Sequence, residues 1–245
     1  RIGTTELPGT EGELVYMDLS AEDLGYPDSI RKYGAVDFMW QRAWDGVWML
    51  NAAYTWSHSW GNNEGYVRSD NGQDDAGLTT LFDQPGLLDG AYGDLPNDRR
   101  HQVKLYGAYA VTDDLTLGAN FQFWTGRPIN AFGYHPTDIF AQDYDSESFY
   151  AGGELAPRGS RGRTSSYYSV DLSASYNIDI GEDQTLVVRA DIFNVLNNDR
   201  VTEVNEIYDD ESSADPTNPD VNPNYGLPTA WQTPRYVRFS VNYSF

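Results

Sequence analysis

The sequence of 245 residues predicts an all-β fold, an antiparallel transmembrane β-barrel with long extracellular loops. Three observations lead to this fold class. Seven segments alternate apolar and polar side chains with a period of two, the pattern of a β-strand with two different faces. These segments are unusually long for strands. Short connections between them alternate with long ones, as in barrels of the bacterial outer membrane.

The seven strands are expected at about 32–44, 47–60, 98–111, 115–127, 164–178, 185–198 and 234–245. In the fifth, Tyr168 and Val170 have one parity, and Ser169 and Asp171 have the other. Strands of soluble proteins usually have about 5–6 residues, whereas a tilted membrane strand needs about 9–11. The segment lengths therefore favour a membrane barrel over the alternative, a soluble all-β protein with an ordinary aromatic core.

The connections agree with this interpretation. Short turns are expected at 45–46, 112–114 and 179–184, and long loops at 61–97, 128–163 and 200–233. Asp45-Gly46 is a strong hairpin signal because both residue types tolerate positive φ. Loops beyond about 12–15 residues are uncommon in compact soluble domains. If the last strand ends in the periplasm, counting back places every short turn there and every long loop outside the cell.

Acidic residues outnumber basic ones by 37 to 16, which gives a formal net charge of −21. Most of the excess acid lies in residues 1–30 and in the three long loops, while the strands are nearly neutral. This balance argues against nucleic-acid binding, which needs clustered Lys and Arg. The chain has no cysteine, so it forms no disulfide and no cysteine-ligated metal site.

The sequence carries no catalytic motif, and we expect the protein not to be an enzyme. His58, His101 and His135 lack the spacing of a metal site such as H-x-x-x-H. The serines of 164–175 belong to a strand face, and no G-x-S-x-G nucleophile elbow occurs.

The last long loop gathers carboxylates in a stretch stiffened by proline. They are Asp209, Asp210, Glu211, Asp215 and Asp220. Because oxygen-rich loops suit Ca²⁺, these residues are candidate calcium ligands. The alternative is a solvated loop whose like charges repel. The acids are also hypothesised to meet lipopolysaccharide, whose phosphates are bridged by divalent cations, or to bind a surface partner protein.

Aromatic residues in the long loops are candidates for a substrate vestibule. They are Phe132, Tyr134, Tyr144, Tyr208 and Trp231. Large loops that stay ordered need small cores of their own, so packing of the loops on each other is the alternative role. Parity also turns four charged strand residues toward the barrel interior: Lys104, Arg189, Asp191 and Arg238.

Four parts of the sequence resemble the TonB-dependent outer-membrane receptors, in the style of the Oar-like subgroup. Residues 236–245 resemble the C-terminal assembly signal, with Phe245 terminal and Tyr243 two before it, although Ser240 stands where glycine is usual. The segment 189–198 resembles the penultimate strand of these receptors. The segments 97–101 and 126–130 resemble the opening and the closing of a strand in them.

The resemblance implies a function and a location. Such receptors take up a scarce solute across the outer membrane of Gram-negative bacteria, and TonB supplies the energy. They have a 22-stranded barrel and an N-terminal plug held by polar contacts with the inner wall. By this resemblance, the four inward charged residues are expected to be contacts of the barrel wall or of the plug, in preference to substrate ligands. The partners are then the plug, TonB, membrane lipid and lipopolysaccharide.

We therefore expect residues 31–245 to be the C-terminal part of such a barrel and residues 1–30 to be an extracellular loop or strand tip. The plug domain is expected to lie outside this chain. Seven strands cannot close an even-numbered single-chain barrel. One alternative is a passive porin or a small closed barrel, with residues 11–19 as an eighth strand. Another is a surface adhesion or structural barrel whose acidic loops bind a partner.

Overall fold

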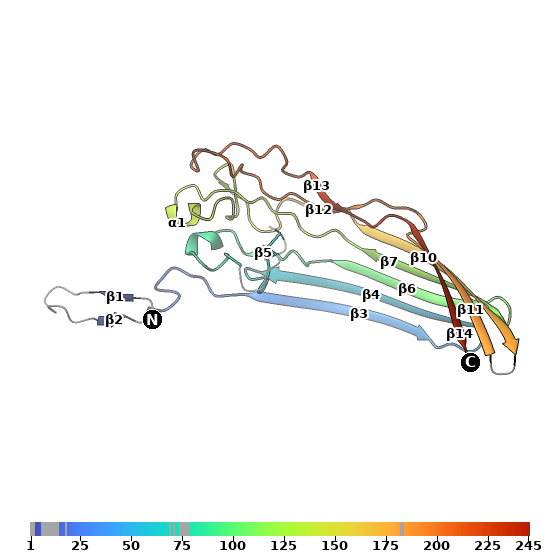
Figure 1. Cartoon of the computed structure of the whole chain (residues 1–245). Helices are drawn as coiled ribbons and strands as arrows, with labels where there is room; N and C mark the ends of the chain where they lie inside the picture. The colour runs from blue at the N-terminus through green and yellow to red at the C-terminus, as the bar shows by residue number, and fades with distance from the viewer. Residues whose placement is uncertain are drawn as a thin grey trace.

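The computed structural model describes residues 3–5, 15–17, 19–68, 70, 72–73, 79–181 and 184–245. Its main feature is one curved antiparallel sheet of long strands, with tight turns at one end and long loops at the other (Figure 1). The long strands, in the order in which they lie side by side, are β14 (Tyr236–Ser244), β11 (Gln184–Phe193), β10 (Tyr167–Gly181), β7 (Leu115–Trp124), β6 (His101–Ala110), β4 (Trp48–Gly61) and β3 (Arg31–Arg42). Each strand therefore lies beside its neighbours in the chain, as in an up-and-down barrel wall.

Short elements complete the fold. They are β1 (Gly3–Thr5) paired with β2 (Val15–Met17), β5 (Gly93–Asp94) paired with β4, β8 (Tyr150–Ala151) paired with β9 (Glu154–Leu155), β12 (Val201–Val204) paired with β13 (Pro228–Trp231), the 3-10 helix η1 (Pro85–Leu88) and the helix α1 (Ile139–Gln142). No helix in the described ranges is both long and apolar enough to cross a membrane.

The seven long strands lie where the alternation predicts them, with differences at their ends. The strand expected to reach residue 198 ends at Phe193, because Asn194 and Asn197 adopt φ values of 48° and 54°, which an extended strand does not allow. The side chain of Asn194 accepts from the Asn198 amide at 3.0 Å and closes this turn. Of the expected eighth strand over 11–19, the structure describes β2, which pairs with β1 and not with the sheet.

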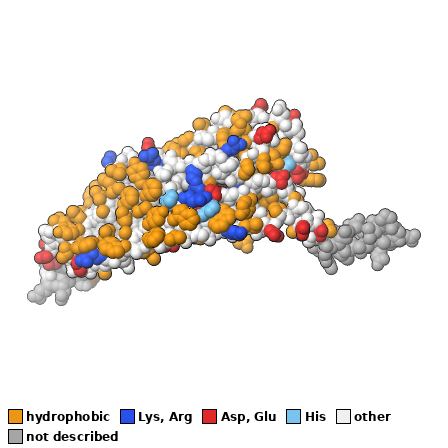
Figure 2. All heavy atoms as spheres, turned by 180° about the vertical axis from the view of Figure 1, so that it is seen from behind, with side chains coloured by type: hydrophobic (Ala, Val, Ile, Leu, Met, Phe, Trp, Pro, Cys, Tyr) orange, Lys and Arg blue, Asp and Glu red, His pale blue; other side chains and the backbone are white. Residues whose placement is uncertain are grey.

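The two faces of the sheet differ sharply in polarity. One face carries apolar side chains that have no covering layer, such as Phe38 on β3 and Phe239 on β14, which is 77% exposed. Figure 2 shows hydrophobic side chains spread broadly over the molecule from behind. The other face carries polar side chains such as Asn120 on β7 and Asp171 on β10. An apolar face of this extent left uncovered is typical of contact with lipid and excludes a soluble two-layer sandwich.

The buried hydrophobic residues of the described chain lie among the loops and not on the long strands. One cluster is formed by Leu81, Leu88, Ala91, Phe132 and Phe149 from two of the long loops. The main chain of Phe132 also forms a β-bridge with Ile207 of the third. The described parts of 61–97, 128–163 and 200–233 therefore pack into one unit, called the loop layer below.

Candidate functional site

The inward face of the sheet carries a charged triad on its last two strands. Asp191 on β11 accepts hydrogen bonds from Arg189 Nε at 2.8 Å and from Arg238 Nη2 on β14 at 3.0 Å. Asp191 and Arg238 are direct cross-strand partners, so the sheet register itself brings them together. The carboxylate is buried beneath the two guanidinium groups, which remain largely exposed.

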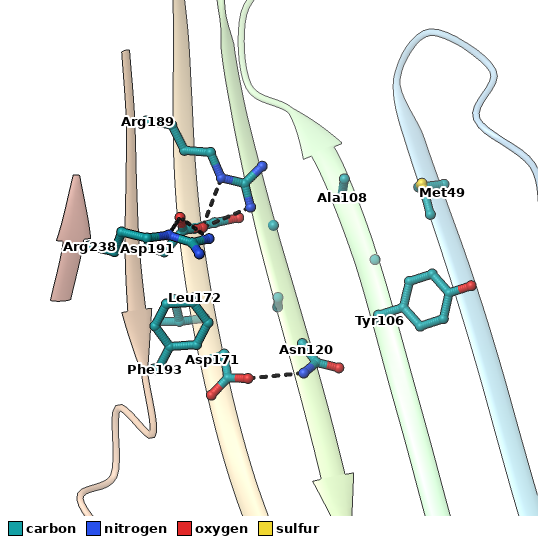
Figure 3. Close-up of a pocket in the computed structure, with 14 residues that line it drawn as sticks. Met49, Tyr106, Ala108, Asn120, Asp171, Leu172, Arg189, Asp191, Phe193 and Arg238 are labelled. Atoms are coloured by element: carbon teal, nitrogen blue, oxygen red, sulfur yellow. Dashed lines mark hydrogen bonds and ion pairs between the residues drawn. The ribbon is translucent and has the colours of Figure 1, made fainter. Parts of the chain in front are cut away.

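This triad borders a hollow of about 340 Å³ on the inward face (Figure 3). At its other side, Asp171 accepts a hydrogen bond from Asn120 Nδ2 at 3.0 Å and another from the Asn194 amide at 2.8 Å. Both carboxylates of the hollow are thus held by groups of the wall. The Nη1 groups of Arg189 and Arg238 have no hydrogen-bond partner among the described residues, so the hollow can offer N–H donors to an acceptor from outside the sheet.

A second hollow, of about 480 Å³, lies on the same face next to the loop layer. It is lined by Arg99, Gln102, Lys104, Gln122 and Trp124. The predicted inward residue Lys104 therefore lies here on β6, three strands away from β11, and not beside the triad. The four inward charges that the sequence grouped together belong to two separate places on the wall.

The candidate calcium residues have different surroundings. Asp209 is fully buried. Its carboxylate accepts hydrogen bonds from the main-chain amides of Tyr134 at 3.0 Å and Gly152 at 2.9 Å, so it joins the loop 200–233 to the loop 128–163. Burial raises the pKa of its carboxyl above the ordinary value. Asp210 and Asp215 instead accept hydrogen bonds within their own turns, which lower their pKa values.

Glu211 and Asp220 are exposed. In the part of the chain that the structure describes, no group of three or more His, Asp or Glu residues is arranged to hold a metal ion. Calcium binding by the last loop stays a prediction.

The predicted vestibule aromatics also divide. Phe132 and Tyr134 are buried inside the loop layer, where Phe132 packs edge-on against Phe149 at 5.2 Å between ring centroids. Tyr144 and Tyr208 are half-buried, and Trp231 on β13 is exposed. The vestibule prediction therefore rests on these last three residues, while the first two pack the loops.

The sequence reasoning missed a buried ionic network that ties the loops together. Arg68 has no exposed surface, and it contacts Glu147 of the next long loop at 2.6 Å and Asp70 at 3.3 Å. Arg158 contacts Asp70 at 3.1 Å and Glu64 at 3.7 Å. The sequence contains one indication of this network: Arg68 is the one basic residue of the acidic segment 61–97.

The network carries carboxyl groups with unusual titration. Burial, reinforced by the charge of Asp70, raises the pKa of Glu64 to about 8. Burial likewise raises the pKa of Glu206 to about 7, although Arg127 pairs with it and the Asn130 amide donates to it at 2.7 Å. The loop layer therefore holds protons near neutral pH that free carboxyls would have lost.

No protein-family model matches the chain. The chain is 30% identical over 253 residues to the TonB-dependent transporter Oar of Myxococcus xanthus. The match covers 90% of this chain and 23% of Oar, so the chain spans about a quarter of the length of that relative.

Solved receptor structures are also among the proteins to which the chain is similar. The ferripyoverdine receptor of Pseudomonas aeruginosa is 14% identical, with a TM-score of 0.47 over 88% of this chain and 20% of the receptor. The siderophore receptor PiuA of Acinetobacter baumannii is 13% identical, with a TM-score of 0.49 over 88% and 22%. The ferric-catecholate receptor Fiu of Escherichia coli K12 is 14% identical, with a TM-score of 0.44 over 87% and 20%.

The likeness to Oar extends over most of this chain. The relative Oar is a transporter, which agrees with the expectation that this protein is not an enzyme. The uncovered apolar face and the same likeness agree with a location in the outer membrane of a Gram-negative bacterium. The resemblance of the strand motifs to TonB-dependent outer-membrane receptors is therefore confirmed by the likeness to Oar over 90% of the chain.

Proposed function

We propose that this chain is part of the wall of a receptor that takes up a scarce solute across the outer membrane with energy from TonB. The observation that carries the proposal is the likeness to Oar over 90% of the chain, combined with a wall that is apolar outward and polar inward. A wall of this kind separates lipid from a wet or protein-filled interior.

The sheet edges support a larger barrel, of 22 strands by the family resemblance. Among the described residues, β3 pairs only with β4, and β14 pairs only with β11. Each of these strands therefore has one edge of free backbone donors and acceptors. Such edges are not left open in a membrane, so further strands are expected to pair with both.

The inward wall is suited to hold a plug. Arg189 and Arg238 share one carboxylate, that of Asp191, which leaves the triad one positive charge in excess. Charge-assisted hydrogen bonds from guanidinium groups are strong and directional. We propose that the plug places an acceptor, such as a carboxylate or a backbone carbonyl, in the 340 Å³ hollow beside them. Lys104 lies higher on the wall, at the separate hollow of about 480 Å³.

Other predicted roles fit their places in the fold. Tyr144, Tyr208 and Trp231 lie in the loop layer, where a solute from outside would arrive first. Tyr243 and Phe245 stack at 5.6 Å between ring centroids at the end of β14. Both belong to the outward parity of the strand, which suits recognition by the assembly machinery within the membrane.

The experiment that tests the function compares three strains: the wild type, a deletion of the full-length receptor gene, and a strain without TonB. All three grow in the same complex medium, and the solutes left in each are quantified by mass spectrometry. We expect a solute that the wild type removes and that both mutant strains leave. Removal without TonB would indicate a passive porin. If the strain without the receptor removes every solute that the wild type removes, the receptor has an adhesion or structural role.

A further inference from the structure

We propose that the 480 Å³ hollow next to the loop layer is a binding subsite for a ring-bearing organic anion, such as an acidic sugar or an aromatic acid. The proposal rests on the uptake function proposed above and names the chemical class of the solute. Five residues carry the argument: Arg99, Gln102, Lys104, Gln122 and Trp124.

A flat aromatic surface borders the hollow. Trp124 on β7 and Tyr167 on β10 are direct cross-strand partners, and their rings stack with centroids 4.0 Å apart and planes at 5°. Trp124 lines the hollow and Tyr167 does not. The hollow therefore borders the indole ring on the side that faces β6. A stacked ring has little freedom to turn, and this fixes the indole as a platform for a ligand ring or for the C–H face of a sugar.

Amide groups surround this platform. Gln102 lies directly across from Trp124, and Gln122 lies directly across from Lys104, so the two glutamines are diagonal neighbours on adjacent strands. Within the described ranges neither side chain makes a hydrogen bond to the protein. Each amide can donate and accept, which suits the hydroxyl groups of a polar ligand.

The charge of the hollow is positive, and none of the described carboxylates forms an ion pair with its two cations. Lys104 forms no ion pair with any described carboxylate, and Arg99 donates only to the main-chain oxygen of Thr125, at 3.1 Å. Burial and the neighbouring guanidinium groups of Arg127 and Arg163 lower the pKa of Arg99 below its usual value. Glu203 and Asp98 act on Arg99 only from a distance and do not pair with it. In a chain of net charge −21, two cations facing one hollow without a direct ion pair to a described carboxylate indicate an anion from outside the wall.

The combination selects the ligand class. A bare inorganic anion would need no aromatic platform, and a neutral sugar would leave the two cations unpaired. The volume lies within the range of about 300–1,000 Å³ that is usual for small-molecule sites. A ring that carries a carboxylate uses the platform, the amides and the cations together.

The test uses the full-length receptor, purified from outer membranes in detergent. Two fluorescent probes differ only in the carboxylate: 4-methylumbelliferyl β-D-glucuronide and the corresponding glucoside. Equilibrium binding is measured at low salt by fluorescence polarisation. We expect the glucuronide to bind at least about fivefold more tightly, which corresponds to about 1 kcal/mol.

Two lysine variants give a matched comparison. Lys104→Met is expected to abolish the preference for the glucuronide. Lys32→Met removes the same charge from the exposed end of β3 and is expected to leave the preference intact. A third variant, Trp124→Leu, is expected to weaken the binding of both probes. Its folding is checked by the mobility shift that intact barrels show on unheated gels.

Three outcomes would overturn the subsite. The first is equal binding of both probes by the wild type, and the second is an equal effect of the two lysine variants. The third is a loss of thermal stability in Lys104→Met without a change in binding, which would show that a plug carboxylate already occupies the hollow. The measurement needs no TonB, so its failure and the failure of TonB-dependent uptake are seen separately.

Discussion

Asp191 and Arg238 face each other across β11 and β14, and the carboxylate of Asp191 lies 3.0 Å from Nη2 of Arg238. Arg189 contacts the other oxygen of the same carboxylate at 2.8 Å. One buried acid therefore holds two guanidinium groups on the inner wall, and this relationship gives the first prediction.

Asp191→Asn removes the charge between the two arginines and leaves them to repel each other. Because both guanidinium groups are largely exposed, we expect a modest loss of about 1 kcal/mol in the free energy of unfolding. Urea titration of the refolded barrel in detergent measures it. Asp179→Asn, near the turn end of β10, is the control and should leave the unfolding midpoint in place. Equal midpoints for both variants would contradict a structural role of the triad.

The loop layer should loosen as pH rises. The folded pKa values of Glu64 and Glu206, about 8 and about 7, lie above the ordinary value of 4.5, so the folded layer binds more protons than the unfolded one. The stabilisation is complete below about pH 4.5 and is lost as pH rises through about 7 to 8. Hydrogen exchange of the loop amides, corrected for the intrinsic rate, should therefore show more opening at pH 8.5 than at pH 5.5.

Glutamine variants test the cause of this loss. Glu64→Gln cannot ionise, so the pH dependence of loop opening should become flatter. Asp220→Asn changes an exposed acid of the same layer and should leave the pH dependence unchanged. A pH dependence that persists in Glu64→Gln combined with Glu206→Gln would assign it to other groups.

Arg68 should be essential to the loop layer but not to the barrel. Arg68→Met leaves the buried carboxylate of Asp70 with one arginine in place of two, and it deprives Glu147 of the guanidinium that donates to it at 2.6 Å. Complete unpairing of a buried charge costs about 3–5 kcal/mol, and the cost here is smaller because Asp70 keeps its contact with Arg158. We expect proteases to cleave the loops at least about tenfold faster, while the barrel keeps its melting temperature. Arg161→Met, at an exposed position in the same layer, should be cleaved like the wild type.

Two adjacent residues of β14 test the direction of the faces. Phe239→Arg puts a charge on the outward face and is expected to cost about 2–4 kcal/mol if the side chain lies near the middle of the bilayer. Ser240→Arg puts the same charge on the inward face and should be tolerated. The amount of folded receptor in isolated outer membranes measures both. A larger loss for Ser240→Arg than for Phe239→Arg would mean that the faces are assigned the wrong way round.

Much of the wall was predictable from the sequence. Successive side chains of a strand point to opposite faces, so parity alone assigns Phe239 outward and Arg238 inward. The same rule predicts that Arg189, Asp191 and Arg238 lie on one face. It predicts neither their contact nor the distance of Lys104 from them, because both depend on which strands are neighbours.

The alternation of apolar and polar residues, the strand lengths and the order of the loops determined on their own that this is a membrane wall with one apolar and one polar face. Only the folded structure decided what the loops do. Arg68 and Glu147 are 79 positions apart, and Asp209 turns inward to hold the Tyr134 amide although its neighbours remain in their own turns. The physical reason is that a period of two is a local property of an extended chain, whereas the pairing of buried charges depends on how separate loops pack together.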